Sequence, residues 1–226
     1  MTKLRGGIGL LGQKQKDYIT IRLLVPRGRL TAEQMDGVAE VIERYGRDYA
    51  IPTIRKGVEI PWIRLEDAPE VIEKFKGMGL LPGSCGTKVR TIVVCAGMDH
   101  CVRSLVDVEG MYERLNDRYY ERDTPTKFKI SLSGCARACS HPHINDFGII
   151  AGEEGFSVLV GGKGGRHPGF GELIVEGVSE DDVFKALDAS LAYFREHAHG
   201  KERINEIIKR NGLDHFKGFV LKAVET

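Results

Sequence analysis

Two short cysteine pairs are the residues whose type and spacing most clearly suggest chemistry. Five residues separate Cys95 from Cys101 and three separate Cys135 from Cys139, so these positions hold four of the five cysteines. Both stretches are rich in small residues, which let the backbone approach a bulky group closely. The pattern predicts a four-cysteine site for an iron–sulfur cluster.

The same four cysteines leave two other interpretations open. Structural zinc sites also use four cysteines, but their pairs are usually spaced C-x2-C, and neither pair here has that spacing. Four unrelated buried thiols are the second alternative, because free cysteine is among the most buried residue types. The neighbouring glycine, histidine and arginine residues are unlike packed core, which favours the cluster. Cys85 stands alone and is expected to be a small residue in a tight loop.

Composition and charge argue against several classes of partner. The chain has 33 lysine and arginine residues against 32 aspartate and glutamate residues, so its net charge of +1 predicts neither nucleic acid nor an acidic membrane as partner. No run of ~18 apolar residues is present, the length that a membrane span requires. The N-terminus also lacks the apolar core of a signal peptide. We therefore expect a cytoplasmic protein, where clustered cysteines more often bind metal or carry redox chemistry than form disulfides.

The first part of the chain predicts an α+β unit. Thr31 is a good N-cap with Gln34 as its capping-box partner, and apolar residues at helical spacing follow. The expected elements run strand–helix–strand–strand–helix, over residues 18–25, 32–45, 48–55, 57–65 and 66–76. This order is typical of a ferredoxin-like half-unit, which we assign to residues 1–80.

A second domain, assigned to residues 81–226, must position the cysteine pairs. Short strands expected over 91–94 and 126–132 each lead directly into one pair, so both pairs start from the end of a rigid element. The other expected elements are a helix over 102–120, strands over 147–151, 156–160 and 172–175, and helices over 179–197, 202–211 and 213–224. The sequence therefore predicts an α/β domain with C-terminal helices.

Four segments follow one another in a recognisable order. Residues 83–90 have the pattern Gly-x-Cys-Gly-x-x-x-Arg, and residues 127–135 have the pattern Lys-Phe-Lys-x-x-x-Ser-Gly-Cys. Asp146-Phe147-Gly148 and the glycine-rich residues 161–165 come later. Together these segments resemble the sirohaem-dependent sulfite and nitrite reductases. The resemblance is strongest to the compact, single-unit (low-molecular-weight, assimilatory-type) sulfite reductases of anaerobes, and it implies that the second domain binds sirohaem and a 4Fe-4S cluster.

The resemblance implies a role for each paired cysteine. Cys95, Cys101, Cys135 and Cys139 are implied to hold a 4Fe-4S cluster, and Cys139 to bridge the cluster to the sirohaem iron. Such a thiolate bridge passes electrons to the haem and tunes its iron. Many family members have proline directly after the first cysteine of each pair, where this chain has alanine. That departure removes no ligand.

The resemblance also places an anion-binding set on Arg55, Arg90, Lys127 and Lys129. Sulfite and nitrite are small anions whose reduction takes up several protons and electrons, so their site needs cations and proton donors. Lys127 and Lys129 share one face because side chains alternate along a strand. Nitrite reductases of the family tend to have asparagine at the position of Lys129, and sulfite reductases lysine. Because sulfite is the more highly charged anion near neutral pH, we expect sulfite.

Sirohaem carries many carboxylates, so its pocket requires cations and backbone donors. The residues expected to supply them are Arg103, Arg137, His141, His143, Lys163 and Arg166. A separate metal on the two histidines is a weaker alternative. The glycine-rich loop 161–166 fits neither the Walker pattern nor the dinucleotide fingerprint, so we expect an anion nest around a sirohaem carboxylate.

The chain contains one copy of a unit that most family members carry twice, with sirohaem held between the copies. In the two-copy enzymes the cluster cysteines lie in one copy and much of the anion-binding set in the other. The resemblance therefore implies either a site completed within one chain or a homo-oligomer whose subunits exchange cations, and we expect the homo-oligomer. No flavin or nicotinamide fingerprint is present, so an external donor such as a ferredoxin is expected.

Reduction of sulfite to sulfide is the function that these observations favour. Reduction of nitrite to ammonia is the nearest alternative. A non-catalytic sirohaem/iron–sulfur protein for electron transfer or sensing is an alternative from another class, and a structural zinc module is a third. The presence of all four anion-binding arginine and lysine residues argues against a non-catalytic protein.

Overall fold

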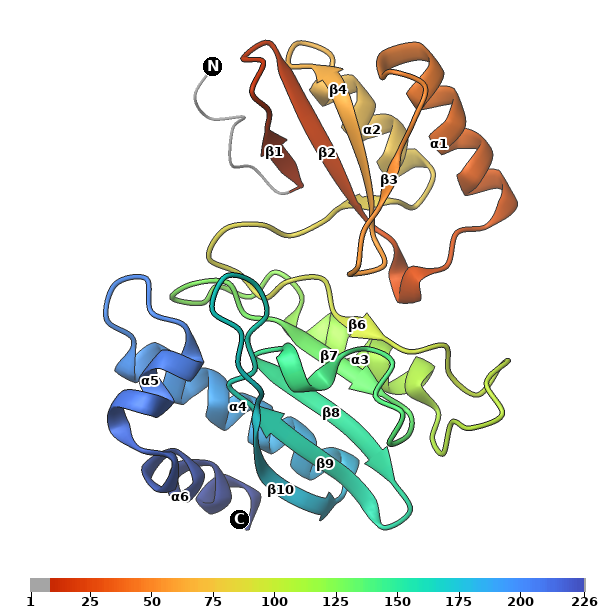
Figure 1. The fold of residues 1–226 in the computed structure, drawn as a ribbon. Helices are drawn as coiled ribbons and strands as arrows, with labels where there is room; N and C mark the ends of the chain where they lie inside the picture. The colour runs from red at the N-terminus through yellow and green to blue at the C-terminus, as the bar shows by residue number, and fades with distance from the viewer. Residues whose placement is uncertain (1–8, 226) are drawn as a thin grey trace. The chain divides into compact units, whose positions relative to one another are not determined.

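The computed structural model describes residues 9–225, which form two compact units that divide between Gly86 and Thr87. Figure 1 shows the course of the chain. The first unit contains β1 (Leu10–Gly12), β2 (Tyr18–Leu24), α1 (Ala32–Tyr45), β3 (Ile51–Pro52), β4 (Val58–Arg64), α2 (Ala68–Gly77) and β5 (Leu81–Pro82). Within the described residues, no helix has both the length and the apolar character needed to cross a membrane.

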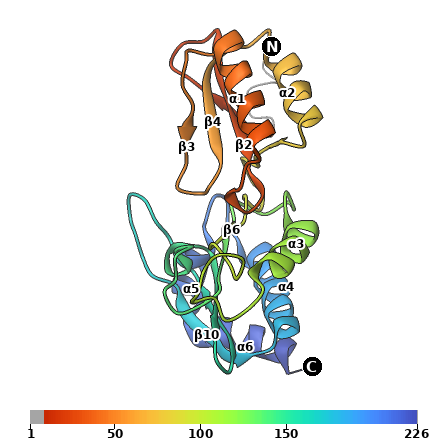
Figure 2. The same ribbon diagram turned by 90° about the vertical axis from the view of Figure 1, so that its right-hand side faces the viewer.

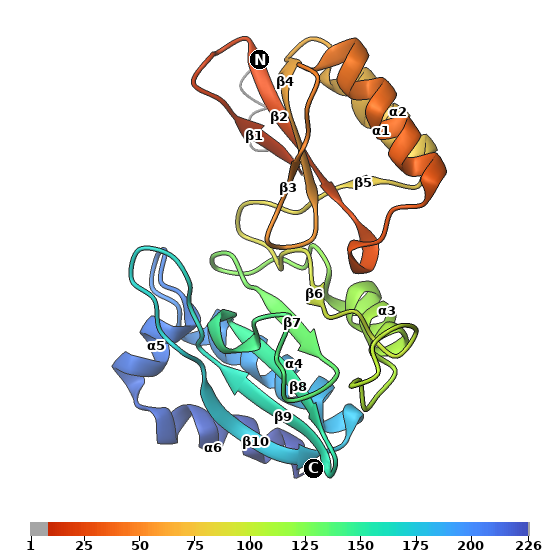
Figure 3. The same cartoon turned by 45° about the vertical axis from the view of Figure 1, so that its right-hand side comes forward.

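The first unit is an antiparallel sheet with both helices on one face (Figure 2). The strand order is β1-β2-β4-β3, and β5 pairs with the end of β2 (Figure 3). Alternate residues of β2, Ile19, Ile21 and Leu23, are buried against Val71 and Phe75 of α2. The strand periodicity therefore produces the apolar face on which the helices pack.

The start of α1 is fixed by the expected capping box. The Gln34 N–H donates to Thr31 Oγ1, and the Thr31 N–H donates to Gln34 Oε1, both at 3.1 Å. These bonds satisfy donors that the first helical turn leaves without an intrahelical partner. The helix predicted over 32–45 is confirmed.

The second unit is built around a mixed sheet of order β10-β9-β8-β7-β6. The pairs β6–β7 and β7–β8 are parallel, and the pairs β8–β9 and β9–β10 are antiparallel. The elements are β6 (Val93–Val94), α3 (Val108–Tyr119), β7 (Ile130–Ser133), η2 (Pro142–Ile144), β8 (Phe147–Gly152), β9 (Gly155–Val160), β10 (Glu172–Val178), α4 (Glu180–His197), α5 (Ile204–Asn211) and α6 (Leu213–Val224).

Helices α3 and α4 lie side by side against this sheet. The ring of Tyr119 on α3 stacks on that of Phe184 on α4, with centroids 6.1 Å apart. Phe128, just before β7, packs against Phe194 of α4 at a centroid distance of 5.8 Å. These rings belong to one continuous core, which also contains residues of β7. Close packing therefore fixes β7, the strand that leads into the second cysteine pair.

Several expected elements are wrong in extent. The strand expected over 172–175 runs on to Val178, and the strand expected over 91–94 is only β6. The helix expected over 102–120 begins only at Val108, because the Asp107 carboxylate accepts the N–H groups of Glu109 and Gly110 and caps it there. The strand expected over 48–55 is only β3. The strand expected over 126–132 joins the main ladder only at Ile130, since the residues before it pair with another segment.

Candidate functional site

The two cysteine loops leave the same edge of the second unit's sheet. Strands β6 and β7 are parallel neighbours, with Val94 opposite Leu132, so their carboxyl ends lie together. Cys95 directly follows β6, and its N–H donates to the Leu132 carbonyl at 3.1 Å. Cys135 follows β7 by two residues. The Gly134 N–H points at the Cys95 sulfur, 3.2 Å away, in the contact that a thiolate ligand accepts.

The loop that carries Cys135 and Cys139 is wound tightly. The Ala138 N–H donates to the Cys135 carbonyl at 3.2 Å, and the His141 N–H donates to the Ala138 carbonyl at 2.9 Å. Ala138 and His141 both have positive φ, 53° and 56°, a conformation that is uncommon for residues other than glycine. Strain of this kind often marks functional loops, because the surrounding structure must hold it.

Close packing holds the first cysteine loop against the second. The Leu105 N–H donates to the Gly134 carbonyl at 2.8 Å, and the Cys101 N–H donates to the Gly97 carbonyl at 2.9 Å. A Cβ at Gly134 would collide with Ser104 Oγ. Glycine in the Ser-Gly-Cys segment therefore lets this loop lie directly on the segment that follows Cys101.

All four cysteines of the pairs are free thiols near the surface. Cys139 is exposed, whereas Cys95, Cys101 and Cys135 are half-buried. Over residues 9–225, no three Cys, His, Asp or Glu side chains converge to form a ready metal cage. Metal–thiolate bonds, rather than contacts between thiols, supply the energy that closes such a site. The donor chemistry and the shared sheet edge fit a cluster. Cys85 belongs to the first unit.

Arg90, Lys127 and Lys129 are brought together although the first is far from the others in sequence. Val89 and Phe128 form a parallel bridge, and the Arg90 N–H donates to the Phe128 carbonyl at 2.8 Å. Val89 and Phe128 are both fully buried in the core. Because side chains alternate along extended segments, the three cationic residues emerge on the opposite face.

This cationic group lies at the opposite edge of the sheet from the cysteines. Lys127 and Lys129 precede β7, whereas Cys135 follows it. Six residue steps separate Lys129 from Cys135, which corresponds to about 20 Å of extended chain. The structure thus places the two predicted groups at opposite ends of one strand.

Arg55 belongs to the first unit, in the turn between β3 and β4. The turn is closed by the Gly57 N–H, which donates to Thr53 Oγ1 at 3.1 Å, and by the Lys56 N–H, which donates to the Thr53 carbonyl at 3.0 Å. Arg55 is half-buried there, next to Ile54, which is 90% exposed.

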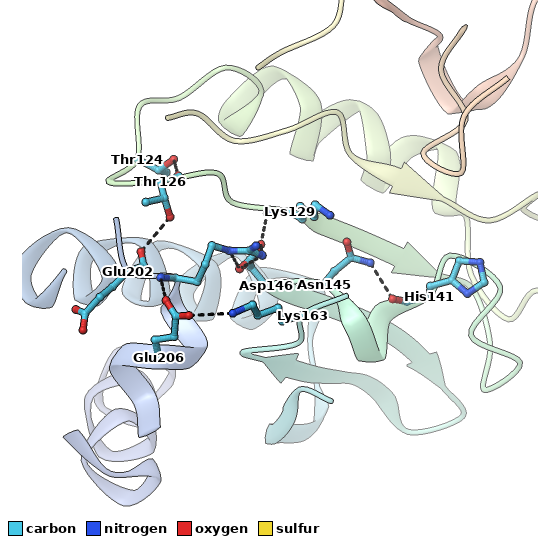
Figure 4. Close-up of polar contacts among 10 residues, drawn as sticks. Thr124, Thr126, Lys129, His141, Asn145, Asp146, Lys163, Glu202 and Glu206 are labelled. Atoms are coloured by element: carbon cyan, nitrogen blue, oxygen red, sulfur yellow. Dashed lines mark hydrogen bonds and ion pairs between the residues drawn. The ribbon is translucent and has the colours of Figure 1, made fainter. Parts of the chain in front are cut away.

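The residues expected around sirohaem lie on three loops. Arg103, Arg137 and His141 are exposed and belong to the cysteine loops. Lys163 and Arg166 lie between β9 and β10. Arg166 is exposed, whereas the Lys163 ammonium pairs with the Glu206 carboxylate at 2.9 Å, as Figure 4 shows.

His143 and the glycine-rich loop pack against each other. The ring of His143 meets that of Phe170 edge-on, with centroids 6.4 Å apart, and the Gly171 N–H donates to the His143 carbonyl at 2.8 Å. A Cβ at Gly162 would approach the carbonyl oxygens of His143 and Asn145 to 2.5 Å. Glycine at this position lets the loop lie directly on the segment before β8.

A buried ion pair that the sequence did not reveal lies beside Lys129. The Asp146 side chain is 1% exposed and that of Arg203 is 9% exposed. Arg203 Nη2 donates to both Asp146 carboxylate oxygens at 2.6 Å, and Nε donates to Oδ1 at 3.0 Å. Burial raises the pKa of the Asp146 carboxyl, while Arg203 and the Lys129 N–H oppose that shift.

Two family matches cover most of the chain. Residues 85–226 match the nitrite and sulphite reductase 4Fe-4S domain, and residues 11–78 match the nitrite/sulfite reductase ferredoxin-like half domain. These matches confirm the predicted fold class, a ferredoxin-like half-unit followed by an α/β domain with C-terminal helices.

Relatives and a solved structure agree with this assignment. The chain is 30% identical over 200 residues to an NAD(P)H nitrite reductase of Emericella nidulans, covering 87% of this chain but only 18% of that protein. It is 24% identical over 210 residues to an assimilatory-type sulfite reductase of Nitratidesulfovibrio vulgaris, covering 92% and 95% of the two chains. Its fold matches that of the Mycobacterium tuberculosis NirA protein with a TM-score of 0.86 at 22% identity, over 98% of this chain and 46% of that one. The chain belongs to the nitrite and sulphite reductase family.

Proposed function

We propose that this chain reduces sulfite to sulfide with electrons from an external low-potential donor such as a ferredoxin. Membership of the family implies a 4Fe-4S cluster and sirohaem as cofactors. The observation that carries the proposal is the convergence of Arg90, Lys127 and Lys129 on one face through the Val89–Phe128 bridge. Three cations on one face suit a small, highly charged anion.

The cysteines of the two pairs are the proposed cluster ligands. Cys95 and Cys135 closely follow β6 and β7, and Cys101 lies in the loop after Cys95. All three are half-buried, which suits ligands of a cluster that must be shielded from water. Cys139 is exposed, which suits the ligand shared with sirohaem. When bound, the two coupled cofactors would relay electrons from the external donor to the anion.

The exposed cations of the cysteine loops are the proposed partners of the sirohaem carboxylates. Arg103, Arg137 and His141 lie on these loops and point charge or donors outward. Lys163 is already held by Glu206, so its contribution requires that ion pair to open or to be shared. Arg166 lies in the same glycine-rich loop and is exposed.

The chain's own cations then have separate tasks. Arg90 holds the anion and stabilises charge that develops on its oxygens, because a guanidinium presents several donors in a fixed fork. The ammonium groups of Lys127 and Lys129 bind the same anion and can pass protons to departing oxygen. Arg55 is the proposed fourth cation of the set.

We further propose that the active site is shared between subunits of a homo-oligomer. About 20 Å of β7 separates Lys129 from Cys135 in one chain, so the two groups face opposite edges of the sheet. A symmetric partner brings the lysines of one subunit to the cysteines of the other without any change of fold.

Substitution Lys129→Asn is expected to shift preference from sulfite toward nitrite. Loss of one charged hydrogen bond to the anion costs about 1.5–3 kcal/mol, so KM for sulfite is expected to rise about 10- to 100-fold. Nitrite carries less charge, so its KM should change less. The measurement is steady-state turnover with each anion and one low-potential donor, with Lys88→Asn as the control because the Lys88 ammonium pairs with Asp123.

The ratio of kcat/KM for sulfite to kcat/KM for nitrite in the unaltered chain shows which of the two anions is the substrate. A higher kcat/KM for sulfite, reversed or abolished by Lys129→Asn, supports the proposal. A higher kcat/KM for nitrite, unaffected by Lys129→Asn, contradicts it and favours nitrite reduction to ammonia. Absence of turnover with both anions in cofactor-loaded protein favours an electron-transfer or sensing role.

A further inference from the structure

The N-terminal end of α5 contacts three separate segments at the cationic edge of the sheet. Arg203 holds Asp146 just before β8, and Glu206 holds Lys163 after β9. The Thr126 hydroxyl donates to the Glu202 carbonyl at 3.0 Å, just before the lysine pair. Figure 4 shows the contacts between Thr126 and Glu202 and between Lys163 and Glu206.

The Asp146 carboxylate connects this helix end to Lys129. Its Oδ2 atom accepts the Lys129 N–H at 2.8 Å, while Arg203 fills the remaining acceptor positions. Lys129 and Asp146 each lie one residue before their strand begins, and the Phe147 N–H donates to the Lys129 carbonyl at 3.0 Å. The Asp146 side chain therefore continues the β7–β8 pairing by one step. Asp146 holds the Lys129 N–H, and the Phe147 N–H holds the Lys129 carbonyl.

Stability alone is a weak explanation of such a buried pair. Desolvation of two charges offsets most of their attraction, so well-packed apolar residues often serve stability equally well. The ion pair orients the Asp146 carboxylate, because the guanidinium of Arg203 binds both of its oxygens and so fixes its plane. A fixed carboxylate then sets the place and orientation of the Lys129 backbone.

We propose that Asp146 and Arg203 are positioning residues that set Lys129 for the anion, so that the C-terminal helices take part in the active site. This inference rests on the proposed function, in which Lys129 binds the anion. The Asp146 carboxylate contacts the Lys129 backbone directly, so the pair acts on the anion site through Lys129.

A double-mutant cycle tests this inference on the sirohaem- and cluster-loaded protein. The dissociation constant of sulfite is measured by titration of the visible bands in the unaltered chain and in Asp146→Asn, Lys129→Met and the double variant. Asparagine keeps the shape but loses one acceptor oxygen, so Asp146→Asn is expected to weaken sulfite binding about threefold to tenfold. In the Lys129→Met background the same change is expected to have no further effect.

Three comparisons make the cycle specific. In a Lys127→Met background, Asp146→Asn should still weaken binding by its full factor. Glu59→Gln removes the Arg22–Glu59 pair of the first unit and should leave binding unchanged. Hydrogen exchange of residues 126–133 should become faster in Asp146→Asn. Arg203→Lys, which keeps the charge and loses the fork, repeats the cycle if Asp146→Asn does not fold.

The outcomes distinguish an error in the role proposed for Lys129 from an error in the positioning role proposed for Asp146 and Arg203. If Lys129→Met does not weaken sulfite binding, the role proposed for Lys129 is wrong. If Lys129→Met weakens binding but Asp146→Asn and Arg203→Lys leave it unchanged, or weaken it equally with and without Lys129, the positioning role is wrong. A fall in melting temperature without any change in binding also contradicts the inference, because it assigns the pair to stability only.

Discussion

Substitution Cys139→Ser is expected to abolish sulfite reduction while leaving the chain folded. Cys139 is exposed at the end of the second cysteine loop, so its loss leaves no cavity in the core. The expected loss is at least a thousandfold in kcat, since a serine oxygen does not replace a bridging thiolate. Turnover is measured together with iron content and the visible spectrum.

Cys85→Ser is the matched control for this substitution. Cys85 is a half-buried cysteine that belongs to the first unit and to neither cysteine pair. Its substitution is expected to leave iron content and turnover close to those of the unaltered chain. Full activity of Cys139→Ser, or loss of iron from Cys85→Ser, would show that the four-cysteine assignment is wrong.

Two inactive variants are expected to restore each other when their chains are mixed. One chain carries Cys139→Ser and the other carries Lys127→Ala with Lys129→Ala. If the site is shared, each mixed dimer has one intact site of two. Isolated mixed dimers should therefore show about half of the activity of the unaltered protein, and an equal random mixture about a quarter. The measurement is turnover of mixed dimers isolated through two different affinity tags.

The reverse mixture gives the opposite result and serves as the control. A chain that carries all three substitutions is paired with the unaltered chain. In a shared arrangement both sites of that mixed dimer are broken, whereas in a site completed within one chain half of the activity remains. Activity in the reverse mixture, with none in the first, would show that each chain completes its own site.

Local signals predicted most of the elements, and their failures have a common cause. The capping box of Thr31 and Gln34 fixed the start of α1 correctly because its partners are only three residues apart. The start of α3 was placed too early, because the Leu105–Gly134 contact holds the residues before Asp107 in a loop. That contact joins distant parts of the chain, so no local pattern reveals it.

The candidate residues were easier to find than their arrangement. Spacing and neighbours single out the cysteine pairs and Lys127 with Lys129, since chemistry restricts the residue types allowed there. The bridge that brings Arg90 beside the lysines and the placement of cysteines and lysines at opposite sheet edges follow from strand pairing. Both are properties of the folded sheet.

Arg203 gave no sequence signal of its role. An arginine before an amphipathic helix is normally exposed, and its partner Asp146 is 57 residues away. From the sequence, Asp146 was identified only as part of the Asp146-Phe147-Gly148 segment, and no role was assigned to it. The ion pair between them is visible only after the C-terminal helices fold back on the sheet.

The visible spectrum of the anaerobically purified chain, reconstituted with iron, sulfide and sirohaem and titrated with sulfite, tests the central claim most directly. The account predicts intense sirohaem bands that shift as sulfite binds, because the anion and the four-cysteine site share one centre. A chain that shows no sirohaem band after reconstitution, or holds only colourless zinc on its four cysteines, would contradict it.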